Sequence, residues 1–154
     1  MTEMERLLDL MDRTWAGDAW HGPSVQKVLE GCTAVEAAER PLPDAHTIHE
    51  LAEHIIIWQE AVRRWLAGED YKVTPELDWK KITDSSETAW ADTRARMAST
   101  RAGLRAAIAA FPAGRLDEPR GAGKMPWYAV LYATVHHDLY HAGQIAMLRK
   151  ATRR

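Results

Sequence analysis

The stretch "TIHELAEHIIIWQEAVRRWLAG" at residues 47–68 has the pattern that decides the fold. Its large apolar residues recur at intervals of three and four, which places them on one face of an α-helix. Thr47 and Glu50 have the spacing of a capping box at the start of this helix, and Gly68 can end it. A single apolar stripe must be covered by other helices, so this stretch predicts a helical bundle. The stripe consists of Ile48, Leu51, Ile55, Trp58, Val62 and Trp65.

Three further stretches show the same helical period, and none shows the alternation that is typical of a strand. Two short helices are expected between the first and second long helices. The sequence therefore predicts an all-α four-helix bundle that forms a single domain over residues 1–154. The other long helices are expected at residues 2–15, at about Ser85–Ala110 with Asp84 and Glu87 at capping-box spacing, and from Pro126 onward; the short ones lie within "SVQKVLEG" and "TAVEAAER".

Composition excludes several classes of protein. The net charge of −2 argues against a protein that binds nucleic acid through its phosphates. Cys32 is the single cysteine, so no internal disulfide can form, which fits a reducing compartment. We find neither a leader peptide nor an apolar run of transmembrane length, and we expect a cytoplasmic protein without membrane partners.

The stretch "HHDLYHAGQI" at residues 136–145 raises the question of a metal site. On a helix, His141 lies about 40° from His137, and both fall within the apolar stripe, whereas His136 lies about 100° from His137 and off that stripe. In the 47–68 helix, His54 borders the apolar face. Three buried neutral imidazoles need partners, and a divalent metal ion bound by their nitrogens would supply one. The alternative is that these histidines are ordinary polar groups of a helical core.

Other catalytic and metal-binding patterns do not occur in this sequence. It has no HExxH motif and no pair of Glu-x-x-His motifs, which argues against a zincin and against a ferritin-like di-iron site. It also has no cysteine pair for a zinc finger, no glycine-rich phosphate loop and no G-x-S-x-G elbow.

Four residues near the candidate ligands could support them. Gln144 points to the same side as the histidine pair and could orient a ligand, or bond to a neighbouring helix. His21, in the loop "AWHGP", could overhang the metal as an acid or base, or cap a helix. Asp138 lies at the edge of the face, where we expect it to be solvated. Glu50 is expected to serve its capping box.

Two glycine-containing features are less specific. The loop "FPAGRLDEPRGAGKM" carries Arg115, Arg120 and Lys124, which could hold a carboxylate-bearing substrate if the loop covers the mouth of the site. Otherwise it is a solvated connector. Gly143, in the interior of the last helix, suggests that a neighbour packs closely there.

Three stretches together resemble the DinB/YfiT-like superfamily of metalloenzymes: residues 19–69 with histidine in mid-helix, "AWADTRARMASTRAGLRAAI", and the closing "HHDLYHAGQIAMLRK" with its His-x-x-x-His followed by Gly-Gln. The resemblance implies a four-helix bundle with a three-histidine site for a divalent metal ion. Zinc or nickel is the first expectation, and iron or manganese follow. By motif position the ligands would be His54, His137 and His141.

The resemblance also implies a class of reactions. Members of this superfamily include transferases and isomerases that use low-molecular-weight thiols, and many are homodimers. We therefore expect a metal-dependent thiol S-transferase or isomerase that acts on a small electrophilic substrate. The alternatives are a metal-dependent hydrolase, a metal-binding stress-response module without turnover, and a purely structural bundle. The sequence identifies no catalytic acid or base.

Overall fold

The computed structural model describes residues 1–122 and 124–153, and it is all-α. Within these residues no strand forms, and an isolated bridge joins Pro119 to Pro126. The predicted four-helix bundle is confirmed, as are the two short helices between the first and second long ones. The elements are α1 (Glu3–Trp15), α2 (Val25–Leu29), α3 (Ala34–Ala38), α4 (Ile48–Leu66), α5 (Pro75–Asp78), α6 (Glu87–Ala109), the 3₁₀ turn η1 (Ala113–Arg115) and α7 (Trp127–Thr152).

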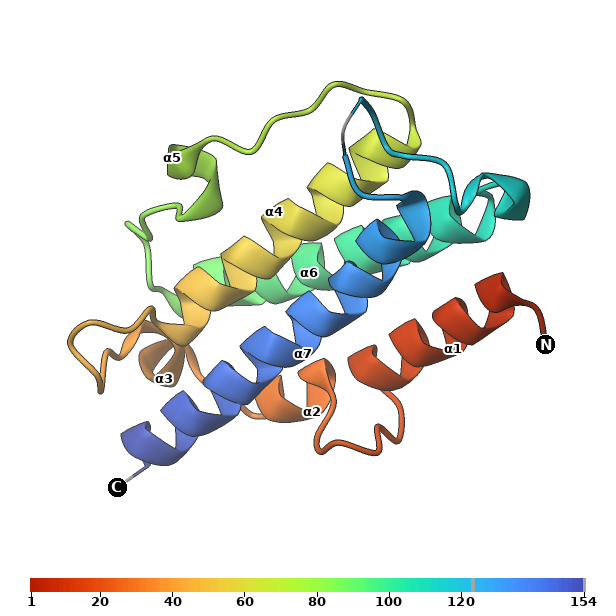
Figure 1. Ribbon diagram of the computed structural model, residues 1–154. Helices are drawn as coiled ribbons and strands as arrows, with labels where there is room; N and C mark the ends of the chain where they lie inside the picture. The colour runs from red at the N-terminus through yellow and green to blue at the C-terminus, as the bar shows by residue number, and fades with distance from the viewer. Residues whose placement is uncertain (123, 154) are drawn as a thin grey trace.

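The four long helices run in two directions (Figure 1). Helices α4 and α6 run the same way and pack most extensively, whereas α1 and α7 run the opposite way. Two parallel neighbours cannot be joined by a short turn, so the connection after α4 must travel back along the length of that helix. Residues 67–86 make this return, and they carry α5 along one side of α4.

Three helices begin with the capping boxes that the sequence predicts. In each predicted box the threonine side chain accepts a hydrogen bond from a backbone N–H, and the glutamate accepts one from the threonine N–H. The boxes open α1, α3 and α4 and pair Thr2 with Glu5, Thr33 with Glu36, and Thr47 with Glu50.

Two local predictions were wrong. Helix α6 begins at Glu87 with Ser86 as its cap, not at Asp84, because the Asp84 carboxylate instead accepts from the Ser86 N–H in the preceding turn. Gly143 is exposed, and no neighbouring group lies within 4 Å of the position that a Cβ would take. This glycine is therefore not explained by close packing within the chain.

The interior divides into two apolar clusters. One gathers α2 and α3 against α4, α6 and α7 around Trp90, and the other gathers α1 against α4, α6 and α7 around Leu7. Between them lies a buried layer of three polar residues, one from each of the three longest helices. We call it the polar layer; its members are Gln59, Arg101 and Asp138.

No helix in the described ranges combines the length and the apolarity that crossing a membrane would require.

The stability of the apolar cluster that surrounds Trp90 should depend strongly on that side chain. The Trp90 side chain is 0% exposed, and its indole N–H donates to the Cys32 carbonyl at 2.8 Å. Replacing Trp90 by Ala leaves a cavity and should lower the free energy of unfolding by about 3–5 kcal/mol. Urea denaturation followed by circular dichroism measures this.

Trp20→Ala is the matched control, because Trp20 is fully exposed at 101%. It should change stability by no more than about 0.5 kcal/mol. Equal losses in the two variants would contradict the packing described here.

Candidate metal centre

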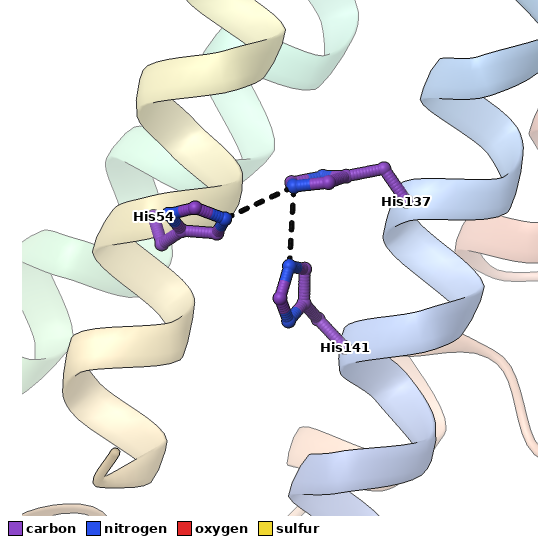
Figure 2. A group of neighbouring side chains, drawn as sticks. All are labelled: His54, His137 and His141. Atoms are coloured by element: carbon purple, nitrogen blue, oxygen red, sulfur yellow. Dashed lines mark hydrogen bonds between the residues drawn. The ribbon is translucent and has the colours of Figure 1, made fainter. Parts of the chain in front are cut away.

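Three histidines from two helices meet in the interior, as predicted (Figure 2). His54 lies in the middle of α4, and His137 and His141 are one turn apart on α7. The Nε2 atom of His137 lies 3.0 Å from that of His54 and 3.1 Å from that of His141. One ligand atom from each residue therefore points toward a common point, and we call this group the three-histidine cluster.

Hydrogen bonds on the far side of two rings fix their tautomers. The Nδ1 atom of His54 lies 3.0 Å from both the carbonyl and a carboxylate oxygen of Asp78, and Nδ1 of His141 lies 2.6 Å from the Oε1 atom of Gln144. These oxygens can only accept, so Nδ1 carries the proton in each ring. The Nε2 atoms of His54 and His141 are consequently left with lone pairs that face His137. Of the two roles expected for Gln144, the structure shows a contact with His141 rather than a hydrogen bond to a neighbouring helix.

A neutral cluster of this kind is short of protons. The Nε2 atom of His137 carries at most one proton and can donate it to only one of its two neighbours, so at least one Nε2 lone pair is left without a hydrogen bond. A bound cation would accept the lone pairs of all three rings. In a tetrahedral site with Zn–N distances of about 2.0–2.1 Å, ligand nitrogens are about 3.3 Å apart, close to the spacing here. The donor set thus fits a divalent metal ion and leaves coordination positions for another molecule.

The α5 segment supplies two supporting residues that the sequence did not reveal. Besides holding His54, the Asp78 carboxylate accepts from the Trp58 indole N–H at 2.7 Å. Trp79 stacks on the His54 ring with centroids 4.0 Å apart, and His46 stacks on Trp79 at 3.5 Å. Ligand histidines in metal sites commonly have their second nitrogen held by a carboxylate in this way.

The interior setting keeps two of the histidines neutral. Burial lowers the pKa of His137 to about 3, and the nearby His141 and His54 add to this effect. Burial also lowers the pKa of His141, against the opposing hydrogen bond to Gln144. Both rings are therefore unprotonated at neutral pH, which is the state that binds metal.

Asp138 is buried rather than solvated, so that expectation was wrong. It is 5% exposed and accepts a hydrogen bond from the Gln59 amide at 2.9 Å. Burial raises the pKa of its carboxyl to about 7, while the Gln59 hydrogen bond and the charge of Arg101 oppose the shift. A helical wheel of α7 alone places Asp138 at the edge of the apolar face, but in the bundle Gln59 from α4 and Arg101 from α6 bury that edge.

The remaining candidates lie elsewhere. His21 lies in the α1–α2 connection and lines a surface pocket together with His136, the histidine predicted to point off the face. The structure therefore does not bring His21 to the three-histidine cluster. Glu50 serves its capping box as expected, and it also pairs with Arg40 at 2.8 Å.

The opposite pKa shifts of His137 and Asp138 predict how stability depends on pH. Below pH 6.5 unfolded histidines gain protons that native His137 and His141 do not, so falling pH destabilises the fold. Between about pH 7 and 4 native Asp138 binds a proton that the unfolded chain lacks, which offsets this loss. In Asp138→Asn the histidine effect is unopposed. The free energy of unfolding should then fall more steeply with acidification, by about 1.4 kcal/mol more per pH unit.

Urea denaturation with a metal chelator at pH 7, 6 and 5 tests this. Asp117→Asn, at an exposed position, should keep the wild-type profile. If Asp138→Asn follows the wild-type profile as well, the buried carboxyl does not titrate as described.

Comparison with known proteins supports the family that the sequence resembles. The DinB superfamily matches residues 19–145, which include every member of the three-histidine cluster. Searches of curated proteins and of solved structures gave no match. Because the match covers most of the chain and the fold agrees with it, this chain belongs to the DinB superfamily.

Proposed function

We propose that this protein binds a divalent metal ion, with zinc or nickel as the first candidates, and acts as a metal-dependent thiol S-transferase or isomerase. The main support for the metal site is the convergence of three Nε2 atoms. Hydrogen bonds from Nδ1 to Asp78 and Gln144 leave two of these Nε2 atoms, those of His54 and His141, unprotonated. Membership of the DinB superfamily supports the class of reaction, because thiol-dependent transferases and isomerases occur among the proteins that this chain resembles.

In this proposal the chain's own residues hold and orient the metal ion. His54, His137 and His141 are the ligands, and the hydrogen bonds of Asp78 and Gln144 keep two of the rings in the tautomer that presents Nε2. Trp79 covers one face of His54 and limits access of water from that side. A divalent ion bound by three neutral ligands lowers the pKa of a thiol or water that it binds, which makes either one a better nucleophile near neutral pH.

In its simplest form the proposed thiol transfer is a nucleophilic substitution. The thiol sulfur forms a bond to an electrophilic carbon, the leaving group departs with the electron pair of its bond to that carbon, and the thiol proton is released to solvent. Hydrolysis differs only in that water replaces the thiol. A protein that binds metal without turnover would show neither reaction.

The metal site is tested by loading untagged protein with zinc. We expect about one ion per chain by elemental analysis and a higher melting temperature in zinc than in chelator. His54→Ala, His137→Ala and His141→Ala should each weaken zinc binding by about 100-fold or more, because each removes one of three ligands.

His136→Ala is the control for this experiment. It removes the neighbouring histidine, which is exposed and points away from the cluster. This variant should bind zinc as the wild type does. Zinc binding that survives the three ligand substitutions would show that the ion binds elsewhere.

The reaction is tested with a panel of low-molecular-weight thiols and 1-chloro-2,4-dinitrobenzene. We expect at least one thiol to displace chloride at a rate that depends on bound metal and is lost in His137→Ala. A nitrophenyl ester without thiol reports hydrolysis in parallel. Ester cleavage alone would move the assignment to a hydrolase, and inactivity of the metal-loaded protein in both assays would favour a binding module.

A further inference from the structure

A pocket of about 500 Å³ opens beside the three-histidine cluster. It lies between α4, α7 and the loop that precedes α7, and His137 belongs to both the pocket and the cluster. This volume is within the range of sites that bind small molecules, about 300–1,000 Å³. A molecule in the pocket would therefore meet the metal site from the His137 side.

The pocket walls are mainly apolar. Trp58 and Trp65 meet edge to face with ring centroids 6.2 Å apart, and Val62 and Val130 complete the walls. Low-molecular-weight thiols are small polar molecules, whereas walls of this kind favour an apolar or aromatic body. The pocket thus suits the electrophilic substrate better than the thiol.

The mouth of the pocket is positively charged. Its more open side carries the half-buried Arg120 and the exposed Lys124, and the Arg120 guanidinium lies 3.9 Å from the centroid of the Trp65 ring. Within the described residues neither cation forms an ion pair with a carboxylate. The carboxylate in the lining, Asp138, lies at the buried end, where it accepts from Gln59.

The third cation of this loop behaves differently. Arg115 pairs with Glu118 at 2.8 Å and lies over the Phe111 ring, and it is not part of the lining. The sequence grouped Arg115 with Arg120 and Lys124 as candidates to hold a carboxylate. The structure separates them, and it leaves Arg115 as a matched control within the same loop.

We propose that this pocket binds the electrophilic substrate and that this substrate carries a carboxylate, which Arg120 and Lys124 bind at the mouth. Its apolar body packs against Trp58 and Trp65, and its reactive end reaches the His137 side of the cluster. An arginine beside an apolar wall is well suited to hold a carboxylate, since the guanidinium can donate two parallel hydrogen bonds. The role as substrate site rests on the proposed function, but the preference for an anionic ligand does not.

Binding of 2-naphthoate, measured by isothermal titration calorimetry on the full-length chain, tests the pocket. The uncharged 2-naphthalenemethanol is the matched ligand. We expect naphthoate to bind about tenfold or more tightly than the alcohol, because hydrogen bonds to a charged group are stronger than those to a neutral hydroxyl. The double variant R120Q/K124Q should lose this preference, and Arg115→Gln should keep it.

The measurement is made on zinc-loaded and on metal-stripped protein, because a carboxylate can also bind zinc directly. Similar affinity in both forms supports the pocket, and binding that requires zinc overturns it. Excess cysteine should not displace naphthoate from the stripped protein; displacement would assign the pocket to the thiol and overturn the proposal. Equal affinity for naphthoate and the alcohol would overturn it too.

These outcomes are separate from those of the proposed function. The R120Q/K124Q variant should bind zinc normally, since neither residue touches the three-histidine cluster. A protein that binds no metal but binds naphthoate through Arg120 and Lys124 would refute the metal-dependent reaction and leave the anionic pocket in place.

Discussion

A shortage of protons among three imidazole nitrogens is the constraint that sets this site apart from an ordinary helical core. Nε2 of His137 faces the other two at 3.0 and 3.1 Å, and hydrogen bonds to Asp78 and Gln144 prevent those two from donating. Such an arrangement is costly in a chain that only has to fold, because apolar side chains would pack there without cost. It becomes favourable when a cation is bound. The cluster could therefore hold a divalent cation.

The connection between α4 and α6 shows how topology serves the site. Because these helices are parallel, the chain must return about 28 Å along α4 before α6 can begin. That return brings α5 against α4, where Asp78 holds His54 and Trp58, and Trp79 covers the His54 ring. A bundle with antiparallel neighbours and short turns would have no segment to place there. The long connection is thus part of the site as well as a consequence of helix direction.

Periodicity and capping could predict the long helices, and orientation on a helix could predict which histidines converge. His54, His137 and His141 were accessible in this way because each lies well inside a strongly periodic helix. Asp78 and Trp79 were not, since a four-residue helix in an irregular connection has no period to detect. The burial of Asp138 was missed for a different reason. A helical wheel describes one helix, whereas this carboxylate is covered by residues of two others, and only the packed bundle shows that.

The polar layer borders the pocket, since Gln59 and Asp138 belong to the pocket lining, and Asp138 directly follows His137 in α7. Gln59, Arg101 and Asp138 interrupt the apolar interior between its two clusters, at the level where α7 carries its histidines. Asp78, Trp79 and Gln144 cover His54 and His141 on their outer sides, while His137 lines the pocket. The three histidines are therefore not equivalent: His54 and His141 are held by hydrogen bonds on their far sides, and His137 lines the pocket. If the proposed function holds, a second molecule would reach this centre from the His137 side, because that is where the bundle leaves a pocket.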